Sequence, residues 1–402
     1  MSHKLIDRND DLRRLREEGF NVDILGANLI VRDVPYLNEK REVLYDGVLI
    51  TSLALNGEIT NRPDDHTIRF AGQYPCTSEG DPIEGIRAGS EVVRFSEKLS
   101  AQHRFSSKPP RGHYENYYEK VRTYAAIISG PAAVIDPHAT ARTFRVVEPE
   151  DDDDSPFHYV DTASARAEID MATAKLKVEK IAIVGLGGTG SYVLDFMAKT
   201  PVKEIHLFDG DKFSSHNAFR APGAASRDDL HKQFLKVEYF EEIYSRLHKG
   251  IVAHGQHVDA TNVEQLRGMS CVFLCIDAGP GKKFIVEKLE EFGILFIDTG
   301  MGLYVSNETI GGIVRVTTSE HGKRETARAR MSFAGDGGPN EYDKNVQIAD
   351  LNALNAVLAV IRWKRLRGFY FDLKRERFTS YTIGNSMLLN EDIIAEHIDD
   401  RS

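Results

Sequence analysis

The chain has 402 residues, enough for two domains of ordinary size. Hydrophobic residues make up 41% and charged residues 28%, which is typical of folded globular proteins and excludes wholesale disorder or a fibrous repeat. The 51 Lys and Arg residues against 61 Asp and Glu give a formal charge of -10. Because that charge repels phosphate backbones, a nucleic-acid partner is not expected.

Cysteine usage and hydropathy indicate the compartment. Cys76, Cys271 and Cys275 are too few for a disulfide framework, and none forms the C-x-x-C pair that is typical of zinc sites. The amino-terminal stretch MSHKLIDRNDDLRRLREE is too charged for a signal peptide, and no apolar run approaches the roughly 18 residues that a membrane span requires. We therefore expect a soluble, cytoplasmic protein that needs no membrane.

The first domain is predicted to be a smaller α+β domain over residues 1–147. A helical pattern covers residues 9–18, and Gly19 ends it. Short β-like runs follow, namely NVDIL, NLIVRDV, GVLITSLAL and HTIRFAG, and residues 114–129 then read as an amphipathic helix. An acidic stretch, EPEDDDDSP, comes next and cannot bury itself, so residues 148–157 are predicted to be a linker.

Residues 158–402 are predicted to form an α/β domain. Apolar strands over residues 180–185, 204–209, 251–254, 271–277 and 294–300 are separated by helical stretches that include 189–200, 228–247 and 282–292. Strands that are apolar throughout and joined by helices favour a mostly parallel sheet covered on both faces. The fold class is therefore a doubly wound, Rossmann-like sheet. A last helical segment, NVQIADLNALNAVLAVIRWKRL, should pack on that core.

A glycine-rich motif, GLGGTG, follows the first of these strands and opens a helix. Glycines at positions 185, 187, 188 and 190 let the backbone turn tightly and approach a phosphate, while the helix offers free N–H groups. Asp209 ends the next strand, where a carboxylate can accept hydrogen bonds from a ribose hydroxyl. These features predict a nucleotide site, but ribose alone does not separate NAD from ATP.

Cations downstream of the second strand favour a triphosphate. Asn217, Arg220 and Lys236 follow the stretch LFDGD, and positioned Arg and Lys side chains stabilise negative charge on departing phosphates. Asp277 follows the strand CVFLCI at the sheet edge where such folds bind ligands, and a carboxylate oxygen there suits Mg²⁺. Cys271 and Cys275, four residues apart, are expected to be small buried hydrophobic residues.

Taken in this order, GLGGTG, LFDGD, HNAFR, LKVE and LCID resemble the ThiF/MoeB adenylyltransferase family, relatives of the ubiquitin-activating enzymes, over about residues 161–366. The resemblance implies an enzyme that joins ATP to the terminal carboxylate of a ubiquitin-like carrier protein. It implies that Asp209 and Asp211 of LFDGD lie in the nucleotide site, with Asp209 on the ribose. Arg220 and Lys236 then bind the phosphates beside Asn217, and Asp277 holds Mg²⁺.

The resemblance also implies a homodimer in which an arginine before the first strand reaches the partner's γ-phosphate, and Arg166 is the candidate. Similarly, residues 321–342 match a mobile crossover loop that covers the carrier tail. No cysteine follows Cys275, so a thioester at the family's usual place is excluded. Either the adenylate passes to a separate acceptor such as a conjugating enzyme, or Cys76, which lies among turn residues and is expected near the surface, receives it.

Two other functions remain open at this point. A dinucleotide-dependent oxidoreductase explains the glycines and Asp209 but leaves Arg220, Lys236 and Asp277 without a task. A non-catalytic nucleotide-binding scaffold needs no cations to stabilise a transition state. For the adenylyltransferase, the two-domain layout suggests that residues 1–147 recognise the carrier or the next enzyme.

Overall fold

The computed structural model describes the chain except residues 1, 148–154, 162–163, 165–168, 334–345 and 392–402. The chain divides into two compact units: Met1–Val147 with Asp161–Ile169, and Glu148–Val160 with Asp170–Ser402. Among the described residues, no helix combines the length and the apolar character that crossing a bilayer requires.

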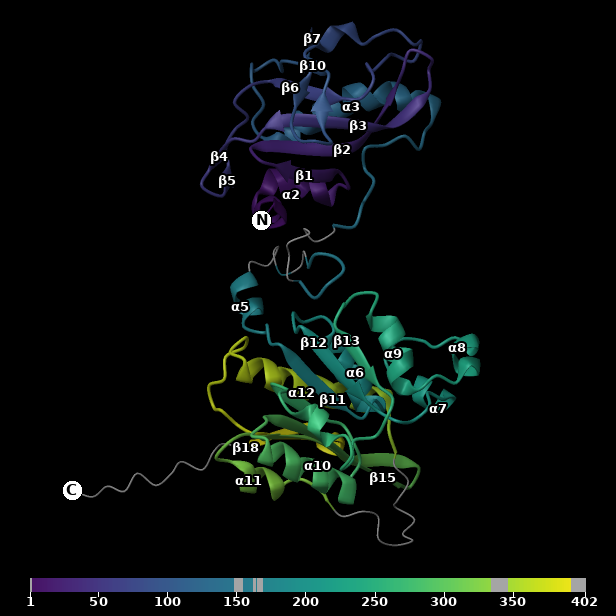
Figure 1. The fold of residues 1–402 in the computed structure, drawn as a ribbon, viewed down its shortest axis with the longest axis vertical. Helices are drawn as coiled ribbons and strands as arrows, with labels where there is room; N and C mark the ends of the chain where they lie inside the picture. The colour runs from purple at the N-terminus through teal and green to yellow at the C-terminus, as the bar shows by residue number, and fades with distance from the viewer. Residues whose placement is uncertain (1, 148–154, 162–163, 165–168, 334–345, 392–402) are drawn as a thin grey trace, which may run out of the picture. The chain divides into compact units, whose positions relative to one another are not determined.

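Unit 1 is an antiparallel sheet with helices packed on it (Figure 1). Its strands run in the order β1-β2-β3-β6-β10-β7, with bounds β1 Asn21–Leu25, β2 Asn28–Leu37, β3 Val43–Ser52, β6 Thr67–Ala71, β7 Arg87–Gly89 and β10 His103–Ser106. Short ribbons join β4 Leu55–Asn56 to β5 Ile59–Thr60 and β8 Val93–Arg94 to β9 Ser100–Ala101. The helices are α1 Ser2–Arg8, α2 Asp10–Glu17, η1 Glu84–Ile86 and α3 Tyr117–Ile135.

Local chemistry sets the helix ends in unit 1. Gly19 adopts φ +94 just after α2, as expected for a glycine that stops a helix. The Asn116 side chain accepts a hydrogen bond from the Glu119 N–H at 2.9 Å and caps α3. Tyr117 and Tyr124 of α3 are fully buried against Phe70 and other sheet residues, which gives this unit its own core.

Unit 2 is built on a mixed eight-stranded sheet in the order β13-β12-β11-β14-β15-β16-β17-β18. The strands from β13 to β15 are parallel, and those from β15 to β18 are antiparallel. Their bounds are β11 Lys180–Val184, β12 Glu204–Phe208, β13 Ile251–His254, β14 Cys271–Leu274, β15 Phe296–Ser306, β16 Thr309–Ser319, β17 Phe378–Thr382 and β18 Met387–Glu391. The predicted doubly wound class is confirmed, with an antiparallel extension at one side.

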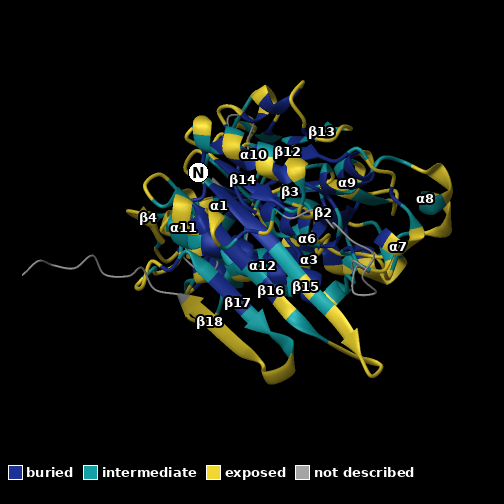
Figure 2. Ribbon diagram, turned by 90° about the horizontal axis from the view of Figure 1, so that it is seen from below, coloured by how far each residue is buried: buried dark blue, intermediate teal, exposed yellow. Residues whose placement is uncertain are grey.

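Helices cover both faces of the parallel strands. Alternate residues of β11 divide between two cores, since Ile181 and Ile183 pack with α6, α9 and α12, whereas Ala182 and Val184 pack with α10. The central strands are therefore buried on both sides, while the tips of β15, β16 and β18 are exposed (Figure 2). The helices are α5 Asp170–Ala174, α6 Gly188–Met197, α7 Ser215–Ala218, α8 Arg227–Lys232, α9 Lys236–Tyr244, η2 Val263–Leu266, α10 Pro280–Glu291, α11 Arg324–Arg328, α12 Ala349–Leu366 and η3 Ile383–Asn385.

Two differences between the predicted and observed elements change the setting of site residues. The helix predicted over residues 228–247 is broken, because Gln233 adopts a left-handed φ of 50 and residues 233–235 form a link that ends with the Leu235 N–H donating to Glu238. The strand predicted over residues 271–277 ends at Leu274. As a result, Lys236 opens a helix and Asp277 lies in a loop beyond its strand.

Candidate nucleotide site

The glycine-rich loop between β11 and α6 forms the floor of a cavity of about 660 Å³. Gly185 adopts φ +89, and a β-carbon at Gly190 would lie 1.8 Å from the Gly185 carbonyl oxygen. The turn is therefore possible only with glycine at both places. Of the predicted residues, the following line the cavity: Gly185, Gly187, Gly188, Asp209, Asp211, Arg220, Lys236 and Asp277. Gly190 lies in the first turn of α6 and does not line the cavity.

Asp209 is held rigidly at the cavity edge. It is 5% exposed, and its two oxygens accept hydrogen bonds from the Leu186 N–H at 2.7 Å and the Asp211 N–H at 2.9 Å. The Lys236 ammonium lies 3.4 Å from both oxygens. The carboxylate is thereby fixed beside the glycine-rich loop, where a nucleotide ribose is expected.

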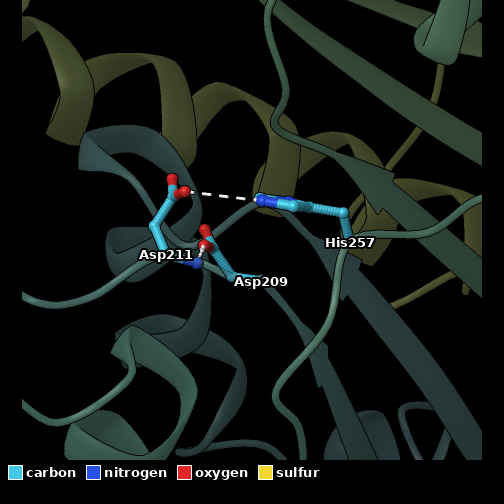
Figure 3. Close-up of side chains that lie close together, drawn as sticks. All are labelled: Asp209, Asp211 and His257. Carbon is cyan, nitrogen blue, oxygen red and sulfur yellow. Dashed lines mark hydrogen bonds and ion pairs between the residues drawn. The ribbon is translucent and has the colours of Figure 1, made fainter.

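Lys236 is tethered by a second carboxylate. Its Nζ donates to Asp211 Oδ2 at 2.7 Å, although the lysine is only 6% exposed. This hydrogen bond is the main reason that the pKa of Asp211 is lowered below its usual value. His257 Nε2 lies 3.4 Å from Asp211 Oδ1, so Asp209, Asp211 and His257 form one cluster (Figure 3).

This cluster could in principle hold a metal ion, because one ligand atom from each residue lies within 4.8 Å of the others. Two of its members already have partners, however, since Asp209 accepts two backbone hydrogen bonds and Asp211 binds Lys236. Asp277 lines the same cavity and is exposed. Its carboxylate fits a divalent cation that takes its remaining ligands from phosphate oxygens and water.

Arg220 and Asn217 have different positions relative to the cavity. Arg220 is half-buried and lines the cavity, and its Nε is buried with no hydrogen-bond partner among the described residues. Asn217 is buried and does not line the cavity. Its Oδ1 accepts from the Ser214 N–H at 3.0 Å, and its carbonyl accepts from the Arg220 N–H at 3.0 Å. Asn217 therefore shapes the turn that carries Arg220.

Sequence reasoning missed a second ionic cluster, two of whose residues, Lys282 and Arg315, line the same cavity. Lys282 Nζ lies 2.5 Å from Asp298 Oδ1, and Arg315 Nη1 lies 3.3 Å from Asp298 Oδ2. Lys282 and Asp298 are almost fully buried, whereas Arg315 is partly exposed. An aspartate inside the apolar strand FIDTG was the available signal, because a buried carboxylate needs a cation.

Two asparagines of α12, Asn352 and Asn355, also line the cavity and were missed. Their segment was predicted only to pack on the core. They are three residues apart and so share one face of the helix. Two amides on one face of the apolar run LNALNAVLAVI were the available signal, because buried amides need hydrogen-bond partners.

Cys76 is not where the sequence suggested. It lies in unit 1 and is 2% exposed, so the prediction of a position near the surface is wrong. The residue forms isolated β-bridges to Leu37 of β2 and to Pro82, and its Sγ lies 3.5 Å from the Tyr74 carbonyl oxygen. Burial, followed by the nearby Glu39 and Asp81 charges, raises the pKa of the thiol. This environment disfavours a reactive thiolate.

The two remaining predicted features fall partly or wholly outside the described residues. Arg166 lies outside them. Of the segment 321–342, predicted to be a mobile loop, residues 324–328 instead form α11, whose Ala327 is buried and whose Arg328 pairs with Glu290 of α10. The mobile-loop prediction is therefore wrong for this part.

Known protein families match residues in both units. The model of the ThiF family matches residues 162–364, and the model of a domain of unknown function (DUF6791) matches residues 10–162.

Ubiquitin-like modifier-activating enzyme 5 of Mus musculus is 24% identical over 35% of this chain and 37% of that protein. The Gallus gallus protein of the same name is 24% identical over 44% and 47%. The chain thus spans less than half the length of these curated relatives. The crystal structure of E. coli MccB with ATP covers 57% of this chain and 69% of its own, with 17% identity and a TM-score of 0.42.

Proposed function

The chain belongs to the ThiF family, whose model spans about half of it, and on this premise we propose that it is an ATP-dependent adenylyltransferase. Its substrate is the C-terminal carboxylate of a ubiquitin-like carrier protein. One observation carries the proposal: a single cavity brings together a glycine-rich loop, the fixed Asp209 carboxylate, the cations Arg220 and Lys236, and the exposed Asp277 carboxylate. This set supplies what a nucleoside triphosphate needs.

The proposed reaction forms one bond and breaks one. A carboxylate oxygen of the carrier bonds to the α-phosphorus of ATP, and the bond from that phosphorus to the bridging oxygen breaks. The products are an acyl-adenylate and pyrophosphate. Asp209 accepts hydrogen bonds from the ribose, and the free N–H groups at the start of α6 face the phosphates. Arg220 and Lys236 stabilise the charge that builds on the departing pyrophosphate.

Asp277 is the proposed ligand of Mg²⁺. When bound, the cation neutralises negative charge on the phosphate oxygens. Asp211 has a supporting task, because its hydrogen bond to Lys236 Nζ holds that ammonium at the cavity. Arg220 Nε is buried with no hydrogen-bond partner among the described residues, so it can donate to a phosphate.

Further parts of the proposal concern partners. We propose a cytoplasmic homodimer in which Arg166 of one subunit reaches the nucleotide of the other. The described unit 1 offers a core of its own and is proposed to recognise the carrier or a conjugating enzyme. The adenylate passes to a separate acceptor, since Cys76 and Cys271 are buried. Cys275 is half-buried and lines the cavity, but desolvation raises the pKa of the thiol to about 12, which disfavours a reactive thiolate.

Pyrophosphate exchange tests the proposed function. Labelled pyrophosphate should enter ATP only when a ubiquitin-like protein ending in glycine is added, because exchange requires reversible adenylation of its carboxylate. The same protein with its terminal carboxylate amidated is the matched control and should support no exchange. Asp277→Ala should lower exchange at least about 100-fold without lowering the unfolding temperature, because the side chain is exposed. Exchange without a carrier would refute the proposed substrate, and exchange that persists in Asp277→Ala would show that the metal ligand is misassigned.

A further inference from the structure

Asn352 and Asn355 each have one half of the side-chain amide fixed by the protein. The Thr189 hydroxyl donates to Asn352 Oδ1 at 3.0 Å. The Asn355 Nδ2 donates to the Gly300 carbonyl oxygen at 3.1 Å. Both asparagines are at most 1% exposed, and both line the cavity. The orientation of each amide is therefore set before any ligand enters.

The other half of each amide is left without a partner. Among the described residues, Asn352 Nδ2 and Asn355 Oδ1 are buried and make no hydrogen bond. A buried polar atom without a partner is unfavourable, so such atoms in native proteins usually await a ligand or an ordered water. This pair offers one donor and one acceptor, one helical turn apart on the same face of α12.

The pair lies on the side of the glycine-rich loop away from Asp209. Asp209 follows β12, whereas the Gly300 carbonyl that holds Asn355 belongs to β15, and β11 and β14 lie between these strands. A β-carbon at Gly188 would lie 2.0 Å from Asn352 Nδ2, so this amide packs against the side of the first turn of α6 that faces α12. If the ribose is at Asp209 and the phosphates are at α6, the asparagines face the acyl substrate.

We propose that Asn352 and Asn355 hydrogen-bond to the backbone of the penultimate residue of an extended C-terminal peptide. In an extended chain, the N–H and C=O groups of one residue point to the same side, as they do in an antiparallel pair of strands. The peptide C=O accepts from Asn352 Nδ2, and the peptide N–H donates to Asn355 Oδ1. The site therefore selects a peptide carboxylate over a simple carboxylic acid. This inference rests on the proposed function and names its substrate class.

A pair of non-hydrolysable acyl-adenylate analogues tests the inference on the full chain. The first is 5′-O-sulfamoyladenosine N-acylated with acetylglycylglycine, and the second carries an ester oxygen in place of the N–H of the penultimate residue. The wild-type protein should bind the amide analogue about 10-fold more tightly, because the ester leaves Asn355 Oδ1 unpaired. Asn355→Ala should bring this ratio close to one while leaving Mg·ATP affinity unchanged within about twofold. Asn38→Ala removes another buried asparagine, whose contacts lie within unit 1, and should preserve the ratio.

The outcomes separate the inference from the function on which it rests. Equal affinity of the wild-type protein for the two analogues overturns the inference alone if Mg·ATP still binds. A loss of Mg·ATP affinity in Asn355→Ala as large as the loss for the amide analogue also overturns it, because the pair would then read the nucleotide base. Failure of both Mg·ATP and the analogues to bind overturns the proposed function and the inference together. The ratio of the wild-type protein's affinities for the amide and ester analogues tests the inference even if Asn355→Ala does not fold.

Discussion

Arg220→Ala will lower carrier-dependent pyrophosphate exchange by about 100- to 1,000-fold while leaving the fold intact. The guanidinium lines the cavity, and its Nε has no partner among the described residues, so its removal breaks no internal contact of that atom. What is lost is the positive charge that opposes the charge on departing pyrophosphate. Exchange kinetics and thermal unfolding, measured on the same preparation, check both halves of the prediction.

Arg246→Ala is the matched control for Arg220. Arg246 is an exposed arginine of the same unit whose partner, Glu242, lies 3.7 Å away, so its removal should change neither exchange nor stability appreciably. Lys236 is a less suitable probe, because its removal would leave Asp209 and Asp211 without their cation. If Arg220→Ala exchanges pyrophosphate at the wild-type rate, the assignment of Arg220 to the phosphates is wrong.

Gly190→Ala will abolish ATP binding and destabilise unit 2 by about 2–4 kcal/mol. The added β-carbon would lie 1.8 Å from the Gly185 carbonyl oxygen, a backbone atom that cannot move without opening the loop. Opening the loop displaces the start of α6 and so removes the N–H groups that face the phosphates. Denaturant unfolding followed by tryptophan fluorescence reports the stability, since Trp363 is buried in the core of this unit.

Gly384→Ala provides the comparison for Gly190. Gly384 also belongs to unit 2, but nothing lies within 4 Å of a β-carbon built there, and its φ is not in the left-handed region. This variant should bind ATP normally and unfold within about 0.5 kcal/mol of the wild-type protein. Normal ATP affinity in Gly190→Ala would contradict the close approach on which the loop depends.

The parallel half of unit 2 could be predicted from sequence because its signals are local. Strands such as KIAIV are apolar after their first residue, and helices separate them, so burial on both faces follows directly. The glycine-rich loop could be predicted for the same reason, because the steric constraint that requires glycine acts between Gly185 and Gly190. The antiparallel strands β16 to β18 were not predicted, since their pattern mixes glycine, threonine and exposed apolar residues.

What could not be predicted depends on contacts between distant parts of the chain. Asp298 pairs with Lys282 and Arg315, and each comes from a different element. Asn352 and Thr189 are separated in sequence by more than half the length of unit 2. Only the packing of α12 on α6 therefore reveals their hydrogen bond. The prediction for Cys76 was wrong because its turn-like neighbours suggested exposure, whereas bridges to Leu37 and Pro82 bury it.

The central claim is that unit 2 binds a nucleoside triphosphate through its phosphates, and calorimetric titration of the full chain with ATP, AMP and NAD⁺ in the presence of Mg²⁺ tests it most directly. Arg220 and Lys236 should make ATP bind at least about 10-fold more tightly than AMP, and NAD⁺ should not saturate the site. Equal affinity for ATP and AMP, or saturable binding of NAD⁺ alone, would contradict the account.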